Sequence, residues 1–316
     1  MTKGANSLQS LINILSQAIL GKEALIKHFL IGLAAEGHIL FEDVPGVGKT
    51  TLVKGLAKAI GCEFKRIQCN PDLLPTDITG VTVYNDKTGE WEFQKGPVFT
   101  QILLVDEINR TSPKTQSALL EPMEEKQVTV DGTTYFLQDP FFVLATQNSH
   151  EYEGTFPLPE SQLDRFIMRL SLGYPSKQHE ISLLTKVIHT NPLNYIEQIM
   201  DPQDFLAIQR EIQQVYVTDE LLEYAADLSI TTRNHEKVQL GISPRGTLNL
   251  IKCSKATAYI CGRDFVLPDD IQEMFFPVCM HRLVVDQNMF LEHNDKEIIL
   301  KDILSQVKVP GSAGRR

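Results

Sequence analysis

Short apolar runs and helical repeats alternate along the first half of the chain. Apolar runs of strand length lie at 39–41, 102–105 and 141–145, and further strands are expected at 64–68 and 167–172. Apolar residues recur at helical spacing over 7–20, 22–36, 49–60 and 113–125. Pro122 lies inside the last of these helices and is expected to kink or shorten it. Strands that alternate with helices in this way predict an α/β domain.

Two segments interrupt this alternation and are predicted to form β-hairpins. In residues 81–99, apolar and polar positions alternate around a turn at 85–89. The second hairpin joins strands at 127–130 and 133–136 through an Asp-Gly pair, which favours a two-residue hairpin turn. Trp91 and Phe93 lie on the first hairpin. They are candidates either for substrate contacts or for packing within the hairpin, and the sequence leaves both open.

The pattern changes near residue 175. From 177 to about 308 strand signals nearly vanish, and helices are expected at 177–190, 202–213, 218–232, 244–261 and 268–283. A chain of 316 residues is long enough for two domains. We therefore expect an α/β core over residues 1–175, a helical domain over 176–309 and a flexible tail over 310–316.

A glycine-containing loop follows the first apolar run. Residues 43–50 read Asp-Val-Pro-Gly-Val-Gly-Lys-Thr, with a strand before them and a helix after them, which is the context of a phosphate-binding loop. Lys49 is expected to reach the β- and γ-phosphates of ATP, and the Thr50 hydroxyl to bind Mg²⁺. Asp43 replaces the first glycine of the usual pattern, at a position that shapes the entry to the loop and does not hold phosphate. The residues predicted to bind the nucleotide are Pro45, Gly46, Val47, Gly48, Lys49, Thr50 and Thr51.

Paired acids end the apolar run at 102–105. Asp106 emerges where the strand stops and is expected to help hold Mg²⁺. Glu107 is suited to orient and polarise the attacking water. An Asp-Glu pair after a strand can also be a solvated turn. Beside a phosphate loop, however, the pair predicts the second half of an ATP-hydrolysis site.

Charge and cysteine content narrow the function classes. A net charge of −10 argues against a protein whose main role is to coat nucleic acid. The five cysteines form no C-x-x-C pair, so we expect free thiols in a reducing cytoplasm. No apolar run reaches about eighteen residues, and the first residues do not resemble a signal peptide. We expect a cytoplasmic protein without a membrane span.

Several contiguous motifs resemble the MoxR family of AAA+ ATPases over nearly the whole chain. They are residues 43–46, 96–99, 105–110, 113–121, 145–148, 153–160, 162–166 and 243–245. The resemblance implies an AAA+ phosphate-loop core with a parallel sheet and two β-hairpin inserts, followed by an all-helical lid domain. It also implies a homo-oligomer, a hexameric ring, that hydrolyses ATP with Mg²⁺ to remodel or mature a client protein. Cofactor insertion and a partner with a von Willebrand factor A domain are associated with the family.

The resemblance assigns further site residues. Asn148 corresponds to the first sensor, which helps to orient the water, and Arg165 to the arginine finger, which enters the site of a neighbouring subunit. Arg245 corresponds to the second sensor on the lid, expected to contact phosphate from above. Gly21 resembles the segment that lines the adenine pocket. The chain departs from the family pattern at Pro122, Ser149 and His150, none of which removes a catalytic group.

Two alternatives of other classes remain. The protein could be an ATP-driven nucleic-acid motor, which the acidic balance disfavours. It could also be a nucleotide-dependent binding switch with little turnover, which Glu107 and Arg165 disfavour. Arg110 could face a neighbouring subunit or only cap local structure. Arg165, taken without the family, would be a surface ion pair.

Overall fold

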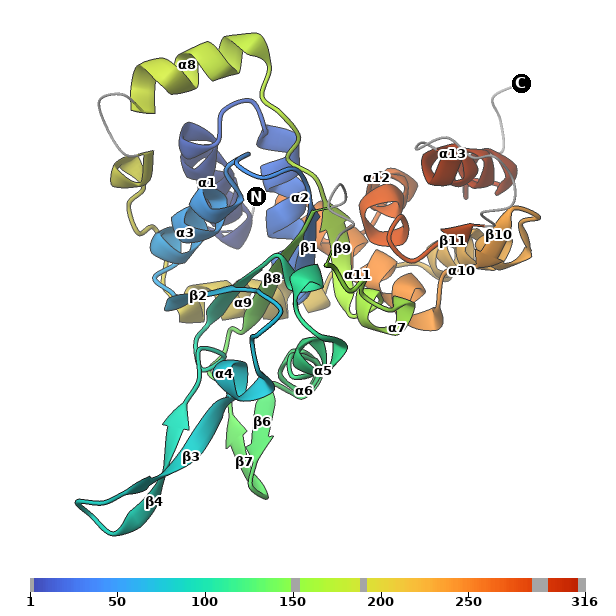
Figure 1. Ribbon diagram of the computed structural model, residues 1–316. Coiled ribbons are helices and arrows are strands. Elements are labelled where there is room, and N and C mark those ends of the chain that lie inside the picture. The colour runs from blue at the N-terminus through green and yellow to red at the C-terminus, as the bar shows by residue number, and fades with distance from the viewer. Residues whose placement is uncertain (1–2, 149–153, 188–191, 286–294, 312–316) are drawn as a thin grey trace.

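The computed structural model describes residues 3–148, 154–187, 192–285 and 295–311. In the first half, helices and strands alternate (Figure 1). The helices there are α1 (Lys3–Ala18), α2 (Glu23–Ala34), α3 (Lys49–Ala59), α4 (Pro75–Thr79), η1 (Ile108–Arg110), α5 (Pro113–Ser117), α6 (Leu120–Glu125) and α7 (Glu160–Leu163). The strands are β1 (His38–Glu42), β2 (Phe64–Gln68), β3 (Gly80–Asn85), β4 (Glu90–Lys95), β5 (Ile102–Asp106), β6 (Gln127–Val130), β7 (Thr133–Phe136), β8 (Phe142–Gln147) and β9 (Phe166–Leu170).

Five strands form one parallel sheet in the order β2-β5-β8-β1-β9. Neighbouring strands are in parallel register, so all their carboxyl ends meet at one edge of the sheet. For example, Leu40 of β1 pairs with Ala145 of β8, and Ala145 pairs with Val105 of β5. The predicted parallel α/β core is confirmed, and this edge receives the phosphate loop and the paired acids.

Both faces of the sheet are buried, which explains the continuous apolar runs in its strands. Alternate side chains point to opposite faces. One face packs in a core with α1, α2 and α3 through residues that include Ile39, Phe41, Leu104 and Leu144. The other face packs against the α4–α6 region through residues that include Leu40, Leu103, Val105 and Val143.

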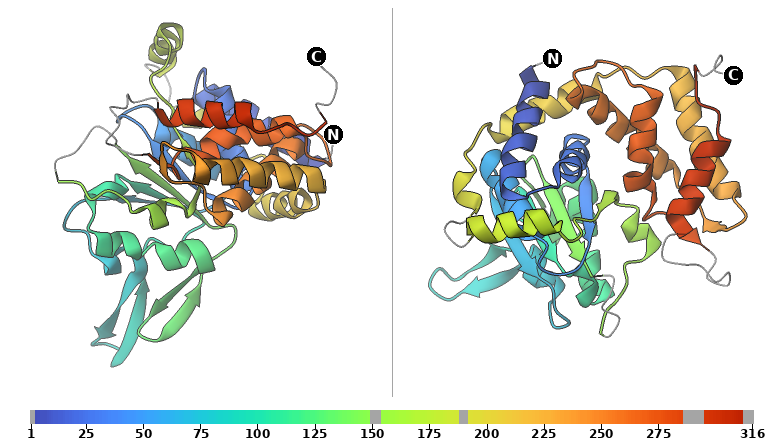
Figure 2. Two further views of the ribbon diagram at one scale, coloured as in Figure 1. Left: turned by 90° about the vertical axis from the view of Figure 1, so that its right-hand side faces the viewer. Right: turned by 90° about the horizontal axis from the view of Figure 1, so that it is seen from above.

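The two predicted hairpins are present and project side by side from the body of the molecule (Figures 1 and 2). Aromatic contacts join them: the Phe93 ring stacks on Tyr135 with centroids 4.4 Å apart, and both rings contact Phe99. Trp91 is instead 70% exposed and pairs edge-on with Tyr84. Phe93 is therefore a packing residue between the hairpins, whereas Trp91 remains available on the surface.

The second half is mainly helical. Its C-terminal helices lie beside β9, whereas the segments Lys177–Val187 and Pro192–Tyr195 lie near α1 and α3 (Figure 1). Its helices are α8 (Lys177–Val187), η2 (Pro192–Tyr195), α9 (Pro202–Gln213), α10 (Asp219–Asn234), α11 (Pro244–Ile260), α12 (Pro268–Cys279) and α13 (Asp295–Gln306). Capping residues followed by proline, Asp201-Pro202 and Ser243-Pro244, set the starts of α9 and α11. The α1–α3 core continues into this half through residues such as Phe205, Leu250 and Phe275.

Some details differ from the sequence predictions. The helix expected at 113–125 is divided into α5 and α6, because the Pro122 ring conflicts with the carbonyl of Ala118, where α5 ends. The half expected to be all-helical also contains a two-stranded sheet, β10 (Val238–Leu240) with β11 (Val284–Val285), and α13 was not predicted individually. Ser149, His150 and most of the predicted flexible tail lie outside the described residues. Among the described residues, no helix is long and apolar enough to cross a membrane.

Candidate active site

The phosphate loop connects β1 to α3 at the carboxyl edge of the sheet. Gly46 and Gly48 have φ angles of +82° and +100°, a region that side chains with a Cβ rarely adopt. Gly48 caps α3, which begins at Lys49, so the unpaired amides of the first helical turn face the loop. Inward-facing amides and the positive end of the helix form an anion site.

Lys49 is held along the phosphate loop. Its Nζ donates hydrogen bonds to the carbonyls of Val44 (3.1 Å) and Asp43 (3.4 Å). Partial burial lowers the pKa of Lys49, although the negative charges of Asp43, Asp106 and Glu107 oppose this effect. Partial burial therefore removes some of the water around the ammonium group of Lys49. A polyphosphate bound in the loop would replace this lost solvation with favourable charge interactions.

The acids predicted to hold the metal and the water lie opposite the loop in one cavity. The residues that line this cavity are Asp43, Pro45, Gly46, Lys49, Thr50, Arg66, Gln68, Asp106, Glu107, Thr146, Gln147 and Asn148. The structure thus brings together the predicted Lys49, Thr50, Asp106, Glu107 and Asn148 from three separate loops. It does so because β1, β5 and β8 are adjacent and end at the same edge.

Polar side chains from β2 contact both acids. Arg66 donates from Nε to Oδ2 of Asp106 at 2.6 Å and from Nη2 to Gln68 at 3.0 Å. Gln68 donates from Nε2 to Oε2 of Glu107 at 3.0 Å. Arg110 Nη1 donates to the same Glu107 oxygen at 3.0 Å, so Arg110 forms an ion pair with this carboxylate within its own chain.

Glu107 has a strained backbone that Thr146 supports. Its φ and ψ are 58° and 48°, the left-handed conformation, which is unfavourable for a residue with a Cβ. Its N–H donates to Oγ1 of Thr146 at 2.9 Å, and the Thr146 hydroxyl donates to Oδ1 of Asp106 at 3.2 Å. One buried threonine on β8 therefore fixes the relative position of the two acids.

Asp43 anchors the phosphate loop to the segment that follows β9. Its buried carboxylate accepts hydrogen bonds from Leu172 N (2.6 Å), Ser171 Oγ (2.8 Å) and Gly173 N (2.9 Å). This segment leads directly into α8 and the helical half. The residue that replaces the usual glycine thus joins the loop to the connection between the two halves.

Gly21 lies near the phosphate loop but does not line the cavity of the acids. Its φ is +69°, and a Cβ there would meet the ring of His179 in α8 at about 2.1 Å. Ile19, two residues earlier, reaches within 3.3 Å of a Cβ placed on Gly48. Gly21 is thus positioned between the loop and α8, where it remains a candidate for the adenine side of the site.

Arg165 and Arg245 lie next to each other at the side of the sheet where the parallel strands begin. The phosphate loop lies at the other side, where the strands end. Arg165 directly precedes β9, whose first residue, Phe166, pairs with His38 at the amino end of β1. Both arginines form ion pairs with Glu124 of α6, Arg245 at 2.7 Å. Burial alone would raise the pKa of Glu124, but hydrogen bonds from the two arginines lower it. Strands of five residues span about 15 Å, so neither arginine shares the cavity of Lys49.

This position differs from the expectation that Arg245 would contact phosphate from above its own loop. The N-terminus of α11, which carries Arg245, faces the amino edge of the sheet and not the phosphate loop. Arg165 Nε is buried and has no hydrogen-bond acceptor among the described residues. Such a buried donor is rarely left unpaired in folded proteins.

Several residues that contact the site were not predicted from the sequence. They are Asp43 as an anchor, Arg66, Gln68, Thr146 and Glu124. Their partners are at least 39 residues away in most cases, so no local motif indicates them. A charged side chain at Arg66, inside a predicted strand that leads toward the acids, was the one available signal.

Comparisons with known proteins agree with this geometry. Residues 38–168 match the family model for the "ATPase family associated with various cellular activities (AAA)", and residues 230–303 match the AAA lid domain. The chain is 50% identical to the uncharacterized protein YeaC of Bacillus subtilis, over 94% of this chain and 92% of the relative. It is 38% identical to the chaperone MoxR1 of Mycobacterium tuberculosis, over 97% and 85% of the two chains.

A solved structure has the same fold. The crystal structure of a candidate ATPase from Cytophaga hutchinsonii superposes with a TM-score of 0.90 at 40% identity, over 97% of this chain and 96% of that one. The chain therefore belongs to the MoxR family of AAA+ ATPases.

Proposed function

We propose that the protein hydrolyses ATP to remodel a client protein. The observation that carries this proposal is the single cavity that holds Lys49, Thr50, Asp106, Glu107 and Asn148. Lys49 and the loop amides bind and orient the β- and γ-phosphates. Glu107 accepts a proton from the attacking water, and Asn148 orients that water beside the γ-phosphate. The wild-type acids thus supply the groups that turnover requires, which favours an enzyme over a binding switch.

The residues present fit a magnesium ion. Asp106 and the Thr50 hydroxyl face the same cavity and offer the hard oxygen ligands that Mg²⁺ prefers. Among the described residues, no cluster of three or more His, Cys, Asp or Glu side chains forms a metal site independent of nucleotide. Such a sparse set suits Mg²⁺, which retains waters and uses substrate phosphates as ligands. When bound, the ion would neutralise part of the negative charge of the phosphates.

The arginine cluster supports an oligomer. Arg165 and Arg245 cannot reach the phosphate loop of their own chain, because they lie at the opposite sheet edge. In a closed homo-oligomer, such as a hexameric ring, that edge of one subunit would face the next subunit's nucleotide. There the two cations would stabilise charge on the departing γ-phosphoryl. Glu124 then holds the pair together until the neighbour's phosphates compete for them.

The paired hairpins are the proposed client contact. Both hairpins carry exposed aromatic side chains: Trp91 is 70% exposed and lies next to the turn of the first hairpin, and Phe136 is 79% exposed at the base of the second. A protein client would bind there. In this proposal the client is shared with a von Willebrand factor A domain partner or receives a cofactor. The name of the relative, chaperone MoxR1, is consistent with the proposed binding of a client protein.

The five free cysteines are consistent with a protein that acts in the reducing cytoplasm, which is the location that we propose.

Steady-state phosphate release tests the proposal. Lys49→Ala should abolish ATP binding, and Glu107→Gln should bind ATP but turn over about 100-fold more slowly. Normal ATP affinity in the first variant, or unchanged turnover in the second, would contradict these roles. Adding DNA or RNA to the same assay tests the nucleic-acid motor: strong stimulation would favour that function, and we expect none.

A further inference from the structure

A buried arginine binds the backbone on both sides of Arg165. Arg282 follows α12 in the lid, and its side chain is only 2% exposed. Its guanidinium donates to Oδ1 of Asp164 (2.7 Å) and to the carbonyls of Phe166 (2.6 Å), Ile167 (3.1 Å), Asp164 (3.2 Å) and Val278. These five bonds match the five N–H groups of an arginine, so a costly buried cation is fully satisfied.

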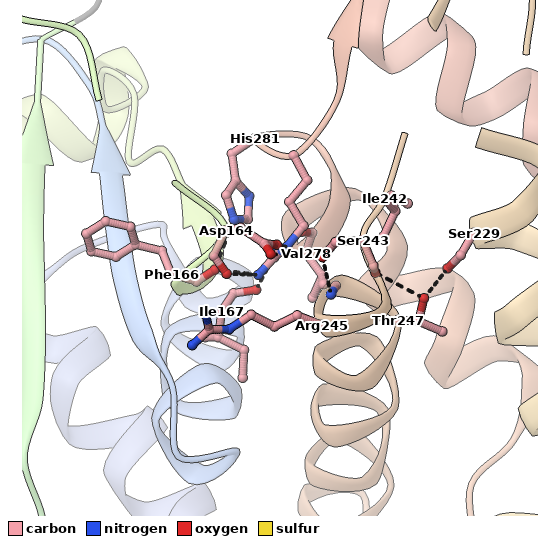
Figure 3. A network of polar contacts seen from close by, with 12 residues as sticks. Asp164, Phe166, Ile167, Ser229, Ile242, Ser243, Arg245, Thr247, Val278 and His281 are labelled. Carbon is pink, nitrogen blue, oxygen red and sulfur yellow. Dashed lines mark hydrogen bonds and ion pairs between the residues drawn. The ribbon is translucent and has the colours of Figure 1, made fainter. Parts of the chain in front are cut away.

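The same carboxylate reaches the start of α11. Oδ2 of Asp164 accepts a hydrogen bond from Ser243 Oγ at 2.8 Å (Figure 3). Ser243 is the N-cap of α11, since its Oγ also accepts from Gly246 N at 3.1 Å. Arg245 is the second residue of that helix. Asp164 therefore lies one residue from Arg165 and one hydrogen bond from the turn that carries Arg245.

Close packing fixes this arrangement further. A Cβ placed on Gly246 would lie 2.9 Å from Cδ of Arg282, so the first turn of α11 rests directly against the arginine stem. Thr247 Oγ1 donates to Ser229 Oγ of α10 at 2.8 Å, which ties the same turn to the next helix (Figure 3). The contacts leave the backbone of Arg165 and that of Arg245 little freedom to move separately.

We propose that Asp164, Arg282 and Ser243 are positioning residues that hold Arg165 and Arg245 as one unit for presentation to a neighbouring subunit. This inference rests on the proposed action of the two arginines in trans. Catalysis by charge stabilisation requires donors fixed before the reaction, because a misplacement of about 1 Å can cost 10²-fold in rate. The brace of Asp164, Arg282 and Ser243 provides that rigidity from the lid side of the molecule.

Ser243→Ala is the informative variant. It removes the Ser243–Asp164 bond while leaving Arg282 with its carboxylate, and it also removes the side-chain cap of α11. Thr218→Ala is the matched control, because Thr218 caps a different helix, α10, through Leu221 N. Ser243→Thr restores a hydroxyl and should restore activity. ATP affinity should stay at the wild-type value in all three variants.

Mixed oligomers separate positioning from general damage. We expect Ser243→Ala alone to lower kcat about tenfold with an unchanged KM for ATP. Mixing it with Lys49→Ala subunits, which have intact arginines, should restore turnover at the Ser243→Ala sites. Mixing it with Arg165→Ala subunits should restore none. A Ser243→Ala protein that behaves like Thr218→Ala, or that Lys49→Ala subunits cannot rescue, would overturn the brace.

Arg165→Ala serves as the reference for the proposed function itself. If Arg165→Ala retains full turnover, the trans action of the arginines is wrong, whatever Ser243→Ala shows. If Arg165→Ala is inactive and is rescued by Lys49→Ala subunits, while Ser243→Ala supplies arginines as well as the wild type does, only the brace is wrong. The two failures are thereby distinguished.

Discussion

Arg66 Nε lies 2.6 Å from Oδ2 of Asp106, so a cation from β2 pairs with the carboxylate proposed to bind Mg²⁺. Asp106 is buried, whereas the Arg66 side chain is 47% exposed and able to move away. The ion pair and the metal therefore compete for one oxygen. Because a half-exposed ion pair contributes at most about 1 kcal/mol, the competition is readily reversed.

Arg66→Gln should raise the apparent affinity for Mg²⁺ in the ATP complex by about threefold, since one competitor is lost. Arg66→Lys keeps a charge and should stay near the wild-type value. Titration with Mn²⁺, followed by electron paramagnetic resonance, measures the affinity without relying on turnover. Weaker metal binding in Arg66→Gln would show that Arg66 supports the ion and does not compete with it.

Thr146→Val should lower kcat about tenfold with little change in ATP affinity. Valine keeps the shape, but it removes both the acceptor for Glu107 N and the donor to Asp106. Without that acceptor, the left-handed backbone of Glu107 loses its support. Thr146→Ser retains the hydroxyl and is the control. Phosphate release and fluorescent-nucleotide binding check the two parameters, and equal turnover in both variants would contradict the role.

Asp43→Ala should destabilise the fold and weaken ATP binding together. Its carboxylate accepts three hydrogen bonds, and the N–H groups of Leu172 and Gly173 would lose their acceptor. We expect the free energy of unfolding to fall by about 2–3 kcal/mol. Asp86→Ala, in the exposed turn between β3 and β4, is the control. Urea unfolding and nucleotide titration measure the two effects; unchanged ATP affinity would show that the anchor does not shape the loop.

Stability should decrease between pH 6.5 and pH 4. Burial lowers the pKa of His38 from 6.5 to about 4, despite a hydrogen bond to the Met123 carbonyl. Within this interval the unfolded chain binds the proton and the folded chain does not, so acid favours unfolding by up to about 3 kcal/mol. His281, buried with a lowered pKa, acts in the same direction.

His38→Gln should flatten this dependence while leaving the part due to His281. Urea unfolding at pH 7.5 and pH 5 measures the slope for both proteins. Equal slopes in the variant and the wild type would show that His38 remains neutral in the unfolded chain as well, or that it is protonated in the folded one.

Phe93→Ala should lower the free energy of unfolding by about 2 kcal/mol, because the ring packs on Tyr135 and Phe99. Trp91→Ala should change it by less than about 0.5 kcal/mol, since the indole is mostly exposed. Thermal unfolding compares the two. Trp91→Ala should reduce client capture by the Glu107→Gln protein in ATP; undiminished capture would place the client elsewhere.

Local chemistry accounts for what the sequence predicted well. The phosphate loop, the acids and both hairpins depend on residues within a few positions of one another. Gly48 and Asp131-Gly132, for example, specify their turns by backbone conformation alone. The division of the helix at Pro122 also follows from a clash four residues away.

Pairings between distant segments account for the remainder. The roles of Asp43 and Asp164 depend on partners that lie 129 and 118 positions later, respectively. The position of Arg245 depends on how the lid packs against β9, which no periodicity reveals. Strands of two or three residues, such as β10 and β11, carry too little pattern to be detected.

The stacked rings of Phe93 and Tyr135 join two hairpins that are separate in sequence. At the base of the first hairpin, a Cβ on Gly80 would lie 2.6 Å from Gly96 N, so the two strands are closely packed where they leave the body of the molecule. A displacement of one hairpin would therefore be transmitted to the other through these rings. The two hairpins would thus move together as one rigid unit.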